Sequence, residues 1–254
     1  MSPMSPSSAE PSTGRTAAVI PAAGRGVRLG PGTPKALRAL GGTPMLIHAV
    51  RAMAASRAVS LVVVVAPPDG APEVKNLIDG HALPERTDYV VVPGGATRQE
   101  SVKLGIDALP EDVSVVLVHD AARPLVPVDT VDAVIETVRD GAPAVVPALP
   151  LADTVKEVEP GEPGAPEPVL STPVRARLRA VQTPQGFDRA TLVRAHERVA
   201  VDGDGATDDA GMVERLGGTV VVVPGHEEAF KVTRPLDLVL AEAVLARRRA
   251  NDGF

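Results

Sequence analysis

The chain has 254 residues and carries 32 acidic against 26 basic side chains, which gives a formal net charge of −6 at pH 7. This balance excludes a bulk electrostatic attraction to nucleic acid or anionic lipid, and an aromatic content of 2% argues against a protein that stacks single-stranded bases. The absence of cysteine excludes disulfides, thiolate metal sites and cysteine nucleophiles together.

The N-terminal residues 1–14 are rich in Ser and Pro and show no periodicity, which predicts a disordered tail. They lack the basic and apolar regions of a secretory signal, and no apolar run in the chain reaches the roughly 18 residues of a spanning helix. We therefore expect a cytoplasmic protein in which residues 15–250 form a single domain.

Short β-branched runs alternate with helical patterns along this domain. Several runs, such as LVVVV from Leu61, are almost entirely apolar, as in parallel strands covered by helices on both faces. The pattern predicts an α/β fold with a doubly wound, mostly parallel Rossmann-like sheet, whose ligands bind at the carboxyl ends of the strands. The expected strands are Ala17–Ala22, Leu61–Ala66, Tyr89–Val92, Val115–Val118, Ala144–Ala148 and Thr219–Val223, and the expected helices Pro44–Ser56, Arg98–Ala108, Val128–Arg139, Arg189–Val199, Asp209–Leu216 and Leu236–Arg249.

A glycine-rich turn, PAAGRGVRLG, follows the first strand at residues 21–30. Such a turn lets backbone N–H groups approach phosphate oxygens, and Arg28 and Lys35 would add positive charge beside them. The turn matches neither Walker A nor the dinucleotide pattern G-x-G-x-x-G, although Gly30 gives a longer spacing that some dehydrogenases use. An ordinary glycine turn with solvated cations remains the alternative.

The third strand ends in PGGATRQESV at residues 93–102, where two glycines precede a helix with Arg98 and Ser101 in its first turn. This arrangement suits a base or a ribose. Taken alone, it is more simply a strand-to-helix turn with a capping Ser or Thr.

The fourth strand ends in HDAARP at residues 119–124. An unpaired carboxylate at the end of an apolar strand is costly, so Asp120 is expected to contact ribose hydroxyls, a substrate or a metal. Arg123 could grip a phosphate with its two-pronged guanidinium, whereas His119 is expected to be structural.

Three later motifs offer further polar groups: TPQ after a short strand-like piece, TDD at the start of a helix, and FKVT as a short strand before the last helix. They contribute Thr183, Thr207 and Lys231. Of the other lysines, Lys35 lies at a strand-to-helix junction and Lys75 on a helical surface. For each motif alone, a cap or a solvated side chain is the simpler interpretation.

Residues 154–175 interrupt the alternation with two short strand-like pieces around a Pro/Gly/Glu turn. They are too polar for a core, and the residues alone allow either a solvated loop or a projecting β-arm.

In this order, the motifs resemble those of the 2-C-methyl-D-erythritol 4-phosphate cytidylyltransferase family over about residues 17–247. The resemblance implies a nucleotidyltransferase fold and a reaction that joins CTP to methylerythritol phosphate with release of pyrophosphate, with Mg²⁺ held mainly by the CTP phosphates and Asp120 as a candidate ligand. It also implies a homodimer in which a β-arm at about 152–177 reaches the partner subunit.

Carried onto this sequence, the resemblance implies three sets of site residues. Those implied for catalysis are Arg28, Lys35 and Lys231. Those implied for CTP binding are Pro21, Ala22, Ala23, Gly24, Arg28, Lys35, Gly94, Gly95, Ser101, Asp120 and Ala121. Those implied for binding methylerythritol phosphate are Asp120, Arg123, Thr154, Arg175, Thr183, Thr207 and Lys231, with Thr154 and Arg175 supplied by the partner's arm.

Two features depart from the family pattern. Ala96 stands where some members have an acidic residue, which removes a side-chain contact to the base. The arm contains five prolines, which predict a short or irregular hairpin: Pro160, Pro163, Pro166, Pro168 and Pro173.

Three other functions compete with this one. A ribitol 5-phosphate cytidylyltransferase would share the CTP half of the site. A nicotinamide dehydrogenase would explain the first glycines, but Ala66-Pro67-Pro68 stands where its acidic residue should close the second strand. A non-catalytic nucleotide binder would not need Lys35, Asp120 and Lys231 together.

Overall fold

The computed structural model describes residues 14–24, 34–199 and 208–251. The predicted tail therefore lies outside the described residues except for Gly14, and so do Arg28 and Thr207.

A mixed sheet of eight strands forms the centre of the protein, in the order β10-β7-β11-β6-β1-β4-β5 with β12 on β7. Strands β1, β4, β5 and β6 are mutually parallel, and β12 is parallel to β7, whereas β10 and β11 run antiparallel to their neighbours. The α/β class and the mostly parallel sheet are confirmed. The strands are β1 Arg15–Pro21, β4 Val59–Ala66, β5 Asp88–Pro93, β6 Val113–Val118, β7 Ala144–Pro150, β10 Arg179–Val181, β11 Gln185–Asp188 and β12 Val221–Pro224.

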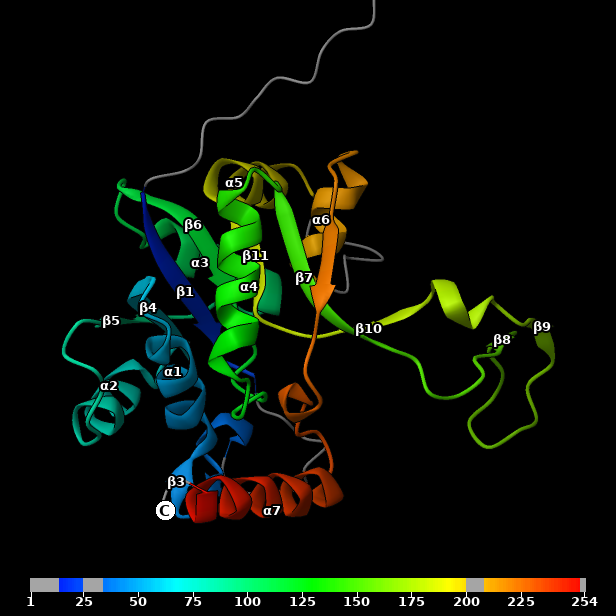
Figure 1. The fold of residues 1–254 in the computed structure, drawn as a ribbon, viewed down its shortest axis with the longest axis horizontal. Helices are drawn as coiled ribbons and strands as arrows, with labels where there is room; N and C mark the ends of the chain where they lie inside the picture. The colour runs from blue at the N-terminus through cyan, green and yellow to red at the C-terminus, as the bar shows by residue number, and fades with distance from the viewer. Residues whose placement is uncertain (1–13, 25–33, 200–207, 252–254) are drawn as a thin grey trace, which may run out of the picture.

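Helices cover both faces of this sheet, as Figure 1 shows. One apolar layer packs α1 (Met45–Ala55), α2 (Ala71–Asp79) and α4 (Val128–Arg139) against the strands. The opposite layer contains α3 (Arg98–Asp107), α5 (Arg189–Arg198) and α6 (Asp209–Arg215). Each strand residue thus faces one layer or the other, which explains why the strand sequences are apolar without alternation.

The last helix, α7 (Pro235–Asn251), lies across the end of the molecule below α1 (Figure 1). Its Ala241 is fully buried in a third, small cluster with Leu40, Met45, Leu125 and Val232. Short elements complete this end: η2 Lys35–Leu37, the pair β2 Ala39–Leu40 and β3 Thr43–Pro44, and η4 Glu227–Ala229.

The structure differs from the predicted elements in three places. Helix α2 contains Lys75, as expected from its place on a helical surface. Its bounds were not predicted, because only Val74 and Ile78 are buried and the apolar periodicity is therefore weak. Strand β11 was missed because QGFD has no β-branched residue, and it is a strand only by pairing with β6 and β7. The predicted strand at residues 230–233 is wrong: the segment makes one backbone bond, from Val232 N–H to Ala122 O, and no strand ladder.

Residues 151–178 leave the body of the protein and carry a small separate sheet, as Figure 1 shows. It pairs β8 (Glu157–Val158) with β9 (Val169–Ser171), with a register irregularity, and η3 (Arg175–Arg177) follows. The hairpin is short and irregular, as the prolines predict. We call this segment the β-arm.

None of the helices in the described ranges combines the length and the apolarity that a bilayer span requires.

Candidate functional site

Two adjoining cavities lie at the carboxyl ends of β1, β5 and β6, the edge at which the sequence motifs place the site. The first, of about 220 Å³, is lined by residues of the turn after β1, of the β5–α3 turn and by Asp120. The second, of about 240 Å³, is lined by the β1 turn, Asp120, and the two lysines Lys35 and Lys231. Pro21, Gly24 and Asp120 line both cavities, so the two form one continuous site.

This site unites most of the residues implied by the resemblance. Lining the first cavity are Pro21, Ala23, Gly24, Gly95, Ser101 and Asp120, together with Ala96, Thr97 and Arg98. Lining the second are Pro21, Ala22, Gly24, Lys35, Asp120, Ala121 and Lys231, together with Ala36 and Ala122.

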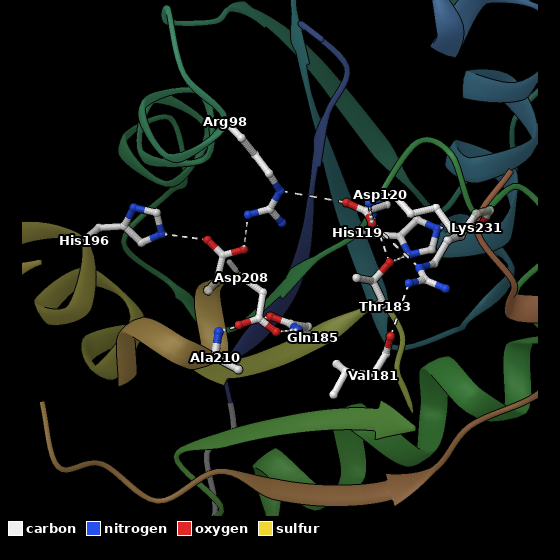
Figure 2. A network of polar contacts seen from close by, with 12 residues as sticks. Arg98, His119, Asp120, Val181, Thr183, Gln185, His196, Asp208, Ala210 and Lys231 are labelled. Atoms are coloured by element: carbon white, nitrogen blue, oxygen red, sulfur yellow. Dashed lines mark hydrogen bonds and ion pairs between the residues drawn. The ribbon is translucent and has the colours of Figure 1, made fainter. Parts of the chain in front are cut away.

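Asp120 is the electrostatic centre of the site (Figure 2). Its Oδ2 lies 2.8 Å from Lys231 Nζ and 3.7 Å from Arg123 Nε, and its Oδ1 lies 3.9 Å from Arg98 Nε. Burial opposes ionisation, but the charges of Lys231, Arg98 and Arg123 outweigh it and lower the pKa of Asp120 to about 2. The carboxylate is therefore fully ionised at neutral pH.

A short hydrogen-bonded chain fixes the backbone of this aspartate. The Asp120 N–H donates to Thr183 Oγ1 at 3.0 Å, and Thr183 Oγ1 lies 3.1 Å from His119 Nδ1. His119 Nε2 lies 3.1 Å from Arg123 O, a carbonyl that can only accept, so Nε2 carries the proton and Nδ1 accepts from the threonine hydroxyl. His119 is thus structural, as predicted, and the hydroxyl of Thr183 supports Asp120; its predicted contact with substrate stays a prediction.

Two backbone carbonyl groups fix the side chain of Arg123. Its Nη1 donates to Ala229 O at 2.7 Å and its Nη2 to Val181 O at 3.3 Å. These bonds tie the loop after β6 to β10 and η4, and they orient the guanidinium beside Asp120. Arg123 does not line either cavity, so its predicted grip on a phosphate stays a prediction.

The turn after β5 is both a helix cap and a cavity wall. Thr97 and Glu100 form a reciprocal capping box at the start of α3, which confirms the simpler interpretation of this motif. The chain also runs close to the β1 turn, because a Cβ on Gly94 would lie 2.9 Å from Ala23 Cβ and from Ser101 Oγ. The glycine is therefore required by this close approach, which brings Gly95 and Ser101 into the cavity wall.

The remaining predicted residues lie elsewhere. Arg28 and Thr207 are outside the described residues, and the N-cap of α6 is Asp208, whose side chain accepts from Gly211 N–H at 2.9 Å. Thr154 and Arg175 lie on the β-arm and line neither cavity, and Arg175 Nη1 donates to Ala152 O within the arm. One chain does not bring the arm residues to the site.

Sequence reasoning named Arg98 only as part of the motif after β5, and it did not predict that Arg98 contacts the buried pair Asp209 and His196. Arg98 Nη1 lies 2.8 Å from Asp209 Oδ2, and Asp209 Oδ1 lies 3.0 Å from His196 Nε2. The signal for Arg98 and Asp209 was present, since both belong to the quoted motifs. His196 lies in the helix α5 and carries no local signal.

The fold and the site define the class of this protein as an α/β nucleotidyltransferase. The turn after β1 and two lysines gather at the strand ends, around one ionised carboxylate. The family model described as 2-C-methyl-D-erythritol 4-phosphate cytidylyltransferase matches residues 16–247.

Similar proteins agree with this match. A protein of that name from Streptomyces avermitilis is 83% identical over 96% of this chain and 97% of its own length. One from Streptomyces coelicolor is 82% identical over 96% and 89%. The crystal structure of the Thermus thermophilus protein of that name has a TM-score of 0.68 at 37% identity, covering 89% of this chain and 97% of that one. The chain therefore belongs to the 2-C-methyl-D-erythritol 4-phosphate cytidylyltransferase family.

Proposed function

We propose that this protein transfers CMP from CTP to 2-C-methyl-D-erythritol 4-phosphate, giving 4-diphosphocytidyl-2-C-methyl-D-erythritol and pyrophosphate for isoprenoid precursor synthesis. Membership of the family supports this function. The structural observation that carries it is the pair of adjoining cavities that share Asp120, one bordered by the β5–α3 turn and the other by Lys35 and Lys231.

The first cavity suits the cytidine and the second the reacting phosphates. Cytidine would lie against Gly95 and Ser101, while the backbone of the β1 turn, with Ala22 and Gly24, would follow the triphosphate. Lys35 lines the second cavity together with Lys231. The acceptor phosphate would enter beside Lys231, whose ammonium Asp120 holds in place at 2.8 Å.

The chemistry requires positioning and charge rather than a base. An oxygen of the acceptor's phosphate, already anionic near neutral pH, attacks the α-phosphorus of CTP in line. The bond from that phosphorus to the bridging oxygen of the β-phosphate breaks, and pyrophosphate leaves with the electron pair. Lys35, Lys231 and Arg28 would neutralise the charge that develops.

Mg²⁺ is the proposed cofactor, and the donor set fits only an ion held mainly by the nucleotide. Asp120 is the one carboxylate among the residues lining either cavity, and no cluster of three or more His, Asp or Glu side chains occurs in the described ranges. A Mg²⁺ ion commonly takes one or two carboxylates together with substrate phosphates. When bound, it would offset phosphate charge, with Asp120 as its protein ligand.

The proposed assembly is a homodimer in the cytoplasm, where CTP is available. Each β-arm would carry Thr154 and Arg175 to the partner's acceptor site. The supporting observation is that these residues lie away from their own chain's cavities, on a segment that projects from the body (Figure 1).

Replacing the two site lysines tests the proposed chemistry. Lys35→Ala and Lys231→Ala should each lower turnover in a pyrophosphate-release assay by about 10²-fold, the usual loss when one electrostatic group at a transition state is removed. Arginine at either position should also impair turnover, because a planar fork replaces a point charge. Lys103→Ala is the matched control, since Lys103 pairs with Asp107 on the surface of α3. Unchanged rates in both alanine variants would contradict the mechanism.

A further inference from the structure

Arg98 reaches the site from the first position of α3. Its side chain lines the first cavity with Gly95, Ser101 and Asp120, and 39% of it is exposed. In Figure 2 the guanidinium of Arg98 lies between Asp120, to its right, and His196, to its left. A half-exposed cation that borders a cavity has donors to offer a ligand, but it needs a fixed position to offer them in a defined direction.

Asp209 supplies that fixed position. It is the first residue of α6 and is fully buried, and its Oδ2 lies 2.8 Å from Arg98 Nη1. Its Oδ1 lies 3.0 Å from Nε2 of His196, whose side chain is 2% exposed. The carboxylate accepts, so the histidine Nε2 donates. Three helices, α3, α5 and α6, are thus joined through one carboxylate.

Burying this carboxylate needs a reason, because an ionised group without water is costly unless it is paired. Capping of α6 is not the reason. Asp208 is the cap, with Oδ1 accepting from Gly211 N–H at 2.9 Å and Oδ2 accepting from Gln185 at 2.6 Å. Both oxygens of Asp209 face side chains, Arg98 and His196.

The charges of this pair persist at neutral pH. Burial opposes ionisation of Asp209, but the hydrogen bond from His196 and the charge of Arg98 outweigh it, so the pKa of Asp209 is below its ordinary value. Burial also opposes the charge of Arg98, and the carboxylates of Asp209 and Asp120 outweigh it, so the pKa of Arg98 is raised.

We propose that Arg98 is a nucleotide-binding residue that donates to an oxygen of CTP, and that Asp209, itself oriented by His196, is the positioning residue that aims it. The inference rests on the proposed location of CTP in the first cavity. Arg98 is held from behind by Asp209 and has Asp120 3.9 Å from its Nε, so its exposed part faces the cavity. A planar guanidinium fixed in this way suits phosphate, ribose or base oxygens of a nucleotide.

The test is the affinity for CTP measured by calorimetry, without any acceptor. Arg98→Gln should weaken CTP binding by about 10- to 100-fold, the loss expected for a hydrogen bond to a charged group. Asp209→Asn keeps the shape and a partner for His196 but releases Arg98, so it should weaken binding by a similar factor. The double variant should bind no more weakly than Arg98→Gln alone, because Asp209 acts through Arg98.

Two further variants keep the proposal falsifiable if Asp209→Asn does not fold. His196→Gln should weaken CTP binding less than Arg98→Gln, and it too should have no further effect in an Arg98→Gln background. Lys103→Gln, which removes a cation from the same helix at the surface, is the control and should bind CTP as the unaltered protein does. Thermal unfolding of every variant verifies folding.

Three results would overturn the proposal. They are unchanged CTP affinity in Arg98→Gln, a loss for Asp209→Asn that persists in full in the Arg98→Gln background, or a loss of the same size in Lys103→Gln. Because the assay contains CTP alone, an error about the acceptor leaves it unaffected. If the unaltered protein did not bind CTP at all, the proposed function itself would fail first.

Discussion

Two neighbouring residues after β6, His119 and Asp120, are held in different charge states: the histidine is neutral and the aspartate is ionised. His119 is fully buried, and its pKa is lowered to about 4 because burial disfavours the imidazolium, while Asp120 keeps its charge with a pKa of about 2. The imidazole is neutral and accepts the Thr183 hydroxyl bond, and the carboxylate is ionised and holds Lys231. At neutral pH the end of β6 therefore presents a negative charge at Asp120 and an uncharged imidazole at His119.

The lowered pKa of His119 predicts a pH dependence of stability. Between pH 6.5 and about 4 the unfolded chain binds a proton at this histidine that the folded chain does not, so the free energy of unfolding falls as pH falls through this window. The loss from His119 should total about 3 kcal/mol. Asp120 does not contribute there, because its stabilisation is present above its ordinary pKa of 3.8 and is lost only as pH falls through about 2.

Urea unfolding at pH 7, 5.5 and 4 measures this effect. Replacing the imidazole in His119→Gln should flatten the dependence relative to the unaltered protein. Equal slopes for the two proteins would show that His119 is not held neutral by the fold.

At the scale of elements, a feature could be predicted when neighbouring residues in the sequence determine it, and could not when contacts between distant segments do. Asp120 was predicted because a carboxylate directly after an apolar strand can be recognised from the six-residue stretch VVLVHD alone. Strand β11 was not found, because its strand character comes from β6 and β7. The pairing of Asp209 with Arg98 was likewise not predictable, because the two residues lie on different helices more than a hundred positions apart, although each belongs to a recognisable motif. Partners that tertiary packing brings together leave no local pattern in the sequence.

The β-arm is only weakly stabilised by contacts within its own chain. Strands of two and three residues do not form a stable hairpin alone, and the arm leaves apolar surface uncovered, with Val169, Leu170 and Val174 each more than half exposed. A partner subunit that covers this surface would stabilise the arm, as the proposed dimer requires.

Mixing two inactive variants tests whether the arm acts across the dimer. Arg175→Ala and Lys231→Ala should each be nearly inactive alone. Co-expressed, they should form mixed dimers in which one site has both intact residues, and should regain about a quarter of the full activity in a statistical mixture. Activity no greater than that of the two separate variants would show that Arg175 serves its own chain or no site at all.

At the scale of the whole molecule, the alternation of apolar strands and helices was enough to predict the layers and the edge of the sheet at which the cavities lie. Most of the cavity lining was predicted through the family that the ordered motifs resemble, whereas of the single motifs only the one with Asp120 favoured a functional role on a local physical argument. The helices on the two faces meet the sheet through separate apolar layers, while the polar residues gather at one end of it. The position of α7 over that end was not predictable, since it depends on a small cluster shared with Leu40, Met45 and Leu125.

The central claim is the reaction, and acceptor-dependent pyrophosphate release tests it most directly. The purified protein would be incubated with CTP and Mg²⁺, and either 2-C-methyl-D-erythritol 4-phosphate or ribitol 5-phosphate as the acceptor. The account predicts rapid release with methylerythritol phosphate and little with ribitol phosphate. Release with ribitol phosphate alone would keep the fold and the phosphoryl chemistry but contradict the proposed substrate, and no release with either acceptor would contradict the proposed reaction.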